Sequence, residues 1–434
     1  MISMHVDRSE LVREEVSRAK LGCGLEVCVL RKSGFAKKYG VLATRFGSID
    51  SRFRIDGSGE VIQVPDGIAH FLEHKLFEEE DGSIDDVFSE LGAYSNAFTN
   101  YTMTGYLFSC VDNFWPSLDT LLGFVMRPHF TDKNVEKEKG IIEQEIRMMD
   151  DSPDWQAVNG LLQSMYQRNP VRVEIVGSVE SINRINKETL YQCYRAFYHP
   201  SNMTLFVVGD VDPAEVVEAA AKVLDGRDFG PVPALERVYP EEPQEVGSAR
   251  VERRMAVSEP ILCFGYKDND IGHEGQALLR RIVGMEMLLD MMLGRSSQLY
   301  NALYEEGLLD ASFDDDFDYE KEYGLVTFEG KTHDPYLLAD RVVQGIEAFL
   351  AHGVSESEFE LTRRKVMGSM LRGFNSLEYI AYNFLTYHFR QMSLLDRVSA
   401  ADALSLEEVV EMGKRVFNRE RMVISVISPP EARP

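Results

Sequence analysis

The sequence predicts an α+β protein of two homologous domains, each a mostly antiparallel sheet packed against helices. The chain has 434 residues, which is long for one domain and suits two cores of roughly 200 residues each. The same order of predicted elements occurs in both halves of the chain. A segment rich in proline, glycine and charge separates the two copies.

The repeat consists of a helix, a turn, a buried apolar strand and a proline stop. Its first copy is LYQCYRAFYHPSNMTLFVVGDVDPAEVVEAAAKVL (190–224), and its second is LEEVVEMGKRVFNRERMVISVISPP (406–430). Aligning Met203 with Met422 gives an offset of 422 − 203 = 219 residues, close to half the chain. We therefore expect a first domain at 1–228, a linker at 229–246 and a second, homologous domain at 247–434.

The composition excludes several classes of protein. No segment approaches the roughly 18 apolar residues of a membrane span, and the polar amino terminus lacks the apolar core of a signal peptide, so we expect a cytoplasmic protein without membrane contact. The net charge of −25 makes nucleic acid a poor partner. The five cysteines are scattered without a Cys-x-x-Cys pair, which indicates reduced core residues rather than disulfides or a thiolate zinc site.

The stretch PDGIAHFLEHKLF (65–77) predicts a helix that begins after the turn at Pro65, with Asp66 as its N-cap. Residues at i, i+3 and i+4 share one helix face, so His70, Glu73 and His74 project together. Two imidazoles one turn apart can bind a single Zn²⁺, and a carboxylate between them can act as general base. His-x-x-Glu-His is the order found in inverzincins.

The alternative is that the two histidines are polar neighbours on a solvated face. The flanking residues argue against it, because nearly every other position from 67 to 77 is apolar. These polar groups are therefore expected to be buried, and buried polar groups need partners.

A zinc site of this kind needs a third protein ligand. The best candidate region is TDKNVEKEKGIIEQEIRMMDD (131–151), an acidic helix that Thr131 or Asp132 caps. One face of this helix is mostly apolar but carries two carboxylates; its members are Glu138, Ile141, Ile142, Glu145 and Met149. We expect Glu145 to be the third zinc ligand and Glu138 to orient a histidine.

In these two helices the sequence resembles the pitrilysin family, which includes mitochondrial processing peptidase and insulin-degrading enzyme. The resemblance spans nearly the whole chain. GIAHFLEHKLFE resembles the family's zinc helix, EKGIIEQEI its third-ligand helix, YSNAFTNYTMTGY (94–106) its Asn-Ala-x-Thr strand, and SSQLYNALYEEGLL (296–309) a helix of its second domain. The half-length bacterial members, which pair as two-chain enzymes, are the most similar group.

The resemblance implies that each chain forms half of a clamshell, and that two chains close around a peptide-sized chamber. It implies one Zn²⁺ per chain, with His70, His74 and Glu145 as ligands and Glu73 as base. Residues 250–434 contain no His-x-x-Glu-His, which agrees with a second domain that holds no metal. Asn96, Ala97, Phe98 and Thr99 fall on the edge strand that, in the family, pairs with the backbone of the substrate peptide.

Two departures from the family pattern affect the assignment. Only 145 − 74 − 1 = 70 residues separate His74 from Glu145, fewer than is usual, which leaves Asp151 as a second choice for the third ligand. The second departure is that Tyr304 and Asp310 stand where active relatives have an arginine and a tyrosine that reach the substrate.

The resulting prediction is a zinc-dependent endopeptidase, the catalytic subunit of a two-chain enzyme. A homologous partner would supply the missing arginine and tyrosine; a homodimer is also possible, and Tyr300 or Arg295 would then be the first substitutes to consider. A non-catalytic subunit of a peptidase complex is the alternative. A zinc enzyme acting on a small molecule is a third reading, which the edge strand and chamber disfavour.

Overall fold

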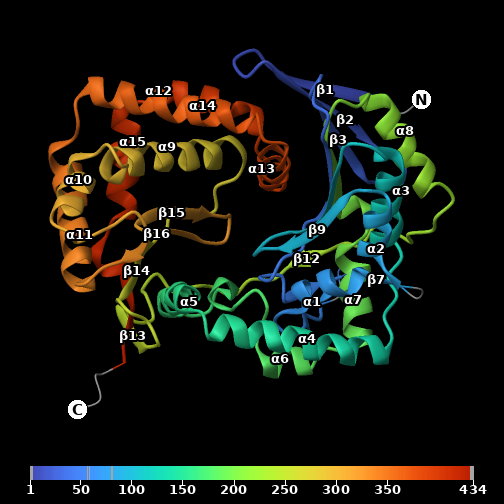
Figure 1. Cartoon of the computed structure of the whole chain (residues 1–434), viewed down its shortest axis with the longest axis horizontal. Helices are drawn as coiled ribbons and strands as arrows, with labels where there is room; N and C mark the ends of the chain where they lie inside the picture. The colour runs from blue at the N-terminus through green and yellow to red at the C-terminus, as the bar shows by residue number, and fades with distance from the viewer. Residues whose placement is uncertain (1–2, 56, 58, 80–81, 431–434) are drawn as a thin grey trace. The chain divides into compact units, whose positions relative to one another are not determined.

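The computed structural model describes residues 3–55, 57, 59–79 and 82–430. The chain divides into two compact units (Figure 1). The first unit consists of the chain up to Ile146, together with the segments Glu174–Tyr239 and Gly373–Phe389. The second consists of Arg147–Val173, Pro240–Arg372 and the chain from Arg390 onward. Among the described residues, no helix combines the length and apolar composition needed to cross a membrane.

The first unit contains a seven-stranded sheet in the order β1-β2-β3-β11-β4-β10-β9. Only the β3·β11 pair is parallel. The strands are β1 (Met4–Ser9), β2 (Glu14–Lys20), β3 (Glu26–Arg31), β11 (Met203–Gly209), β4 (Lys38–Thr44), β10 (Thr104–Cys110) and β9 (Tyr94–Thr99). The helices are α1 (Ile68–Leu76), α2 (Ile84–Glu90), α3 (Phe114–Val125), α4 (Asp132–Asp150), α6 (Val179–Asn183), α7 (Lys187–Phe197), α8 (Pro213–Leu224) and α13 (Leu377–Phe389).

The second unit contains a five-stranded sheet in the order β13-β17-β14-β16-β15, in which only the β13·β17 pair is parallel. Its strands are β13 (Arg250–Arg254), β17 (Met422–Ser428), β14 (Ile261–Lys267), β16 (Gly324–Lys331) and β15 (Asp314–Tyr319). Its helices are α5 (Pro153–Met165), α9 (Gly275–Leu293), α10 (Gln298–Glu305), α11 (Pro335–His352), α12 (Glu356–Gly373), α14 (Arg397–Ala403) and α15 (Leu406–Val416).

The two sheets share one topology, which confirms the predicted α+β class with its internal repeat. In each, a buried strand lies parallel to one neighbour and antiparallel to the other: β11 between β3 and β4, and β17 between β13 and β14. Met203 and Met422, the two residues that the offset aligned, are the first residues of β11 and β17.

The compact units depart from the predicted ranges 1–228 and 247–434 because two helices are exchanged. Helix α5 comes from the first half of the chain but packs on β14 and β17 of the second sheet. Helix α13 comes from the second half but packs on β4 and β11 of the first sheet. An apolar helix face predicts that the helix packs against another element, but the sequence pattern does not identify which sheet that element is.

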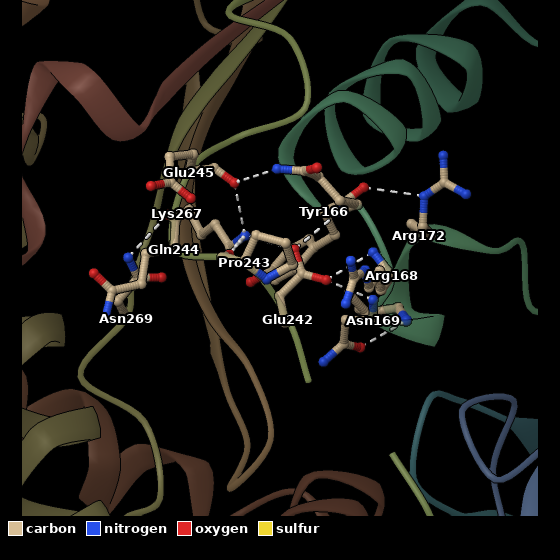
Figure 2. Close-up of polar contacts among 12 residues, drawn as sticks. Tyr166, Arg168, Asn169, Arg172, Glu242, Pro243, Gln244, Glu245, Lys267 and Asn269 are labelled. Atoms are coloured by element: carbon tan, nitrogen blue, oxygen red, sulfur yellow. Dashed lines mark hydrogen bonds and ion pairs between the residues drawn. The ribbon is translucent and has the colours of Figure 1, made fainter. Parts of the chain in front are cut away.

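The predicted linker, 229–246, contains ordered contacts. Its short strand β12 (Glu236–Arg237) pairs with β5 (Arg52–Arg54) in the first unit. In the second unit, the Glu242 carboxylate accepts a hydrogen bond from the ammonium of Lys267 (Figure 2). The distance between the two groups is 2.6 Å. The carboxylate also accepts three backbone N–H groups after α5, those of Gln167, Arg168 and Asn169, at 2.7–2.9 Å. Burial raises the pKa of Glu242, but these donors outweigh burial and the net pKa is lowered.

The cysteines are all free. Cys28, Cys110, Cys193 and Cys263 are buried, as the sequence predicted, whereas Cys23 is partly exposed.

Candidate metal centre

Helix α1 carries four polar residues among buried apolar ones: His70 and Lys75 are buried, and Glu73 and His74 are partly buried. Its N-cap is Gly67 rather than the predicted Asp66. Gly67 has a φ of 86°, and a Cβ there would lie 2.5 Å from the carbonyl oxygen of Val176, so both conformation and space require glycine. The prediction of Asp66 was wrong because this close approach to a distant loop decides where the helix begins.

Helix α4 brings the acidic residues to α1. Thr131 caps it, accepting the backbone N–H of Asn134 at 3.2 Å. Glu138 and Ile142 are buried as the helical period predicted, but Ile141 is 47% exposed. The buried stripe of α4 is therefore narrower than the sequence indicated.

Three ligand atoms from the two helices converge: one each from His70, His74 and Glu145 lie within 4.8 Å of one another. Nε2 of His70 is 3.5 Å from one carboxylate oxygen of Glu145, and Nε2 of His74 is 3.6 Å from the other. Two atoms that each lie 2.0–2.1 Å from a tetrahedral Zn²⁺ are about 3.4 Å apart. The donor types and their spacing therefore fit zinc, and no other group of this kind occurs in the part of the chain that the structure describes.

Glu138 holds one imidazole in orientation. Nδ1 of His74 donates to a Glu138 oxygen at 3.0 Å, which directs Nε2 of the same ring toward Glu145. The other Glu138 oxygen lies 3.6 Å from the ammonium of Lys75. Lys75 is fully buried and also pairs with Glu78. This carboxylate–imidazole pair has the arrangement common around zinc-ligating histidines.

Glu73 lies beside the ligand atoms but not among them. The hydroxyl of Thr99 on β9 donates to one Glu73 oxygen at 2.6 Å. Burial raises the pKa of Glu73, against the opposing effects of His70, Thr99 and His74. The pKa of Glu145 is lowered, first by its hydrogen bond with His70, although burial opposes this. Burial lowers the pKa of His74, but Glu138 and Glu73 outweigh burial, and the net pKa is raised.

A cavity of about 280 Å³ connects the helix with the edge of the sheet. Glu73 and His74 line it from α1, Phe77 from the residue after α1, and Ser95, Asn96 and Ala97 from β9. Strand β9 pairs only with β10, so its other edge is unpaired in the seven-stranded sheet. An unpaired edge offers backbone donors and acceptors to an added strand.

The side chains of β9 differ in what they can do. Asn96 is exposed, and its side-chain oxygen accepts the backbone N–H of Ala97 at 2.9 Å. The ring of Phe98 packs against Gly105 and lies 5.3 Å from the ring of Tyr382 on α13. Phe98 is therefore engaged in packing, and Thr99 is engaged with Glu73.

Other residues singled out in the sequence lie outside this cluster. Asp151, the second choice for a ligand, is exposed beyond the end of α4 and is not part of the metal-binding group. In the second unit, Tyr304 is 56% exposed and Tyr300 is buried, while Asp310 accepts the backbone N–H of Ser312 at 2.8 Å.

Sequence reasoning missed three contributions. Lys75 was not considered, because lysine is rarely buried without a partner. The contact of Thr99 with Glu73 joins residues 26 positions apart in the chain, so no local pattern could reveal it. Asp85, which accepts the hydroxyl of Ser95 at 2.7 Å and lines the cavity, also carries no motif.

Comparisons with known proteins identify the family. Residues 58–178 match the family Insulinase (Peptidase family M16), and residues 184–366 match the Peptidase M16 inactive domain. The chain is 41% identical to the uncharacterized zinc protease YmfH of Bacillus subtilis (strain 168), over 97% of this chain and 98% of that protein.

Two further similarities agree. A crystal structure of an M16-like peptidase from Alicyclobacillus acidocaldarius has a TM-score of 0.93 and 36% identity, and the match covers 96% of this chain and 99% of that one. A probable mitochondrial-processing peptidase subunit beta of Arabidopsis thaliana is 22% identical over 85% of this chain and 72% of that protein. The resemblance to the pitrilysin family that the sequence indicated is thereby confirmed.

Proposed function

Because the chain belongs to peptidase family M16, we propose that it is a zinc-dependent endopeptidase whose metal is held by His70, His74 and Glu145. The observation that carries this proposal is the convergence of their three ligand atoms within 4.8 Å beside Glu73 and the cavity under the edge strand. These three ligand atoms would hold one Zn²⁺ per chain.

Zinc bound there would polarise the scissile carbonyl and lower the pKa of water to about 7. Glu73, which lies beside the ligand atoms, would take a proton from the attacking water and return it to the leaving nitrogen. The hydroxyl of Thr99 donates to one Glu73 oxygen, which leaves the other oxygen for proton transfer. General acid–base catalysis of this kind contributes roughly 10²- to 10⁴-fold.

The substrate would be an extended peptide added to β9. Main-chain hydrogen bonds to the free edge around Asn96 and Ala97 would align it with the cavity that Glu73 lines. Binding through the main chain depends little on the side chains of the peptide, so cleavage should tolerate varied sequences. For Phe98 and Thr99, whose side chains are engaged within the protein, a contribution through the backbone is the remaining role.

The working enzyme would contain two chains. Tyr304 and Asp310 occupy the positions at which active relatives carry an arginine and a tyrosine, and neither a phenol nor a carboxylate supplies those groups. A homologous chain would then provide them, which agrees with the relative named as a subunit beta. The cytoplasmic location stays a prediction.

The test separates a catalytic chain from a non-catalytic one. Zinc content is measured by atomic absorption for the purified chain and for His70→Ala, His74→Ala and Glu145→Gln. We expect about one zinc in the wild type and loss in all three variants, but not in Glu136→Gln, which alters an exposed acid of the same helix. Stoichiometric zinc in His70→Ala would refute the ligand assignment.

Turnover is then followed by mass spectrometry on an unstructured peptide, with and without a homologous chain that carries the arginine and tyrosine. We expect cleavage by the mixture, and loss of cleavage with retained zinc in Glu73→Gln, because an amide keeps the shape of the side chain but cannot accept the proton. Zinc-loaded mixtures that cleave no peptide would favour the non-catalytic subunit. Full activity of the isolated chain would remove the need for a partner.

A further inference from the structure

A second, larger cavity of about 950 Å³ lies in the first unit. Four separate segments line it: Ile55, the residues that follow α3, the end of α7, and the loop from 227 to 233. It shares no lining residue with the cavity next to Glu73. Its volume is within the range of about 300–1,000 Å³ typical of sites for small molecules.

Three arginines face this cavity: Arg127 after α3, Arg195 on α7, and Arg227 in the loop. In a chain with 71 acidic and 46 basic side chains, none of the three forms an ion pair among the described residues. The lining contains one carboxylate, that of Asp228, and it accepts the backbone N–H of Gly230 at 2.9 Å.

Arg227 is the least exposed of the three arginines. Its Nη1 is buried and has no hydrogen-bond partner within the described chain. Burial lowers the pKa of Arg227, and the positive charge of Arg127 lowers it further. Buried polar groups almost always have a partner, and an unsatisfied one that lies in a cavity is available to a bound water, ion or ligand. The same loop is held in place by the Asp228–Gly230 contact, so the guanidinium is presented by an ordered turn.

Aromatic and apolar side chains form much of the remaining lining, together with the polar Gln192 and His199. The rings of Tyr194 and Tyr198 stack at 4.9 Å with an interplanar angle of 16°, and Phe229, Met126 and Pro233 are among the apolar lining residues. The hydroxyls of both tyrosines are already used, one by the carbonyl of Val125 and the other by Tyr106. The cavity therefore offers cationic hydrogen-bond donors next to flat apolar surfaces.

We propose that this cavity is a binding site for a small organic anion, with a phosphate or carboxylate group held by Arg127 and Arg227 and an aromatic body against the tyrosines. The planar guanidinium forms paired hydrogen bonds with both kinds of anion, and aromatic surfaces stack well on aromatic rings. Because no lining residue is shared with the cavity at Glu73, this ligand is separate from the peptide that is cut.

Binding is measured by isothermal titration calorimetry on metal-free protein at low ionic strength, so that anions cannot bind a metal ion. The probes are phenyl phosphate, benzoate and inorganic phosphate. We expect saturable 1:1 binding of phenyl phosphate or benzoate, whichever group the site prefers, and weaker binding of inorganic phosphate because it lacks the ring. No saturable binding of any probe up to millimolar concentration would overturn the proposal.

The matched variants are Arg227→Gln, Arg127→Gln and the control Arg364→Gln, which removes an exposed arginine from α12. We expect each of the first two to weaken binding about tenfold or more, since each removes a charge-assisted hydrogen bond. Without ligand, Arg227→Gln should melt no lower than the wild type, because it removes a charged group whose Nη1 is buried without a hydrogen-bond partner in the described chain.

If Arg227→Gln fails to fold, Arg127→Gln decides alone, since Arg127 is exposed at the cavity rim. Unchanged affinity in Arg127→Gln, or an equal loss in Arg364→Gln, would show that the anion binds elsewhere.

Discussion

The contact between Glu138 and His74 can be changed without removing any of the three proposed zinc ligands. Replacing Glu138 by glutamine keeps the size of the side chain and still allows an oxygen to accept the Nδ1–H of His74. It removes the negative charge that faces both this imidazole, at 3.0 Å, and the ammonium of Lys75, at 3.6 Å. The change therefore tests orientation by charge rather than by shape.

The size of the effect follows from the contact that changes. A hydrogen bond to a charged group contributes about 1.5–3 kcal/mol and a neutral one about 0.5–1.5 kcal/mol. The side chain of Glu138 is only 8% exposed, so little solvent screening reduces the difference. A loss of about 1.4 kcal/mol is tenfold in affinity, and losing a partner of a ligating histidine commonly costs 10- to 100-fold. We expect Glu138→Gln to weaken zinc binding at least tenfold.

The assay is competition for zinc with a chromophoric chelator, which reports a dissociation constant for each variant. Glu136→Gln is the matched control, because Glu136 is an exposed acid on the same helix. Lys75→Met should reproduce part of the loss, since it leaves the Glu138 carboxylate without its buried cation. An affinity for Glu138→Gln within twofold of the wild type would refute the role given to this carboxylate.

Three further changes test other contacts. Thr99→Val should lower kcat at least severalfold with zinc retained, because Glu73, the proposed general base, loses its hydroxyl donor; unchanged kcat would contradict this. Hydrogen bonding to His388 lowers the pKa of Glu26 to about 2, with Arg18 assisting and Asp7 and Cys28 nearby, so its stabilising effect is present above about 4.5 and is lost as the pH falls toward 2. Urea unfolding should therefore show Glu26→Gln less stable than the wild type at neutral pH, with the gap closing on acidification; a gap independent of pH would be evidence against it. Glu242→Gln should destabilise the second unit by about 1–3 kcal/mol in thermal unfolding, whereas the exposed neighbour Glu241→Gln should not.

The elements that the sequence predicted are those that a local period defines. One helical turn places His70, Glu73 and His74 on one face, and the same period on the acidic helix selects Glu145. The offset of 219 residues located β11 and β17, because a buried strand between a turn and a proline stop is a strong local pattern. All of these depend on neighbours within about ten residues of one another.

The features that the sequence did not predict depend on contacts between distant segments. The exchange of α5 and α13 between the sheets is one, since amphipathic faces do not name their partners. The burial of Lys75 is another, because it requires Glu138 from a separate helix. The exposure of Ile141 is a third: the width of a buried stripe is set by what packs on it, and the helical period gives only its direction.

The internal repeat shows how the two units differ at the helix that carries the proposed metal site. Helix α1 lies between β4 and β9 in the chain, and helix α9 lies between the corresponding strands β14 and β15. The buried positions of α1 include His70 and Lys75, whereas those of α9 are almost all apolar apart from Arg281. The buried residues of α9 include no histidine. Arg281 forms ion pairs with Asp268 and Asp270, so its charge is balanced by carboxylates of the same unit. The same topology thus serves two purposes: in the second unit the helix completes a core, and in the first the cost of burying imidazoles and carboxylates is offset when they share a cation.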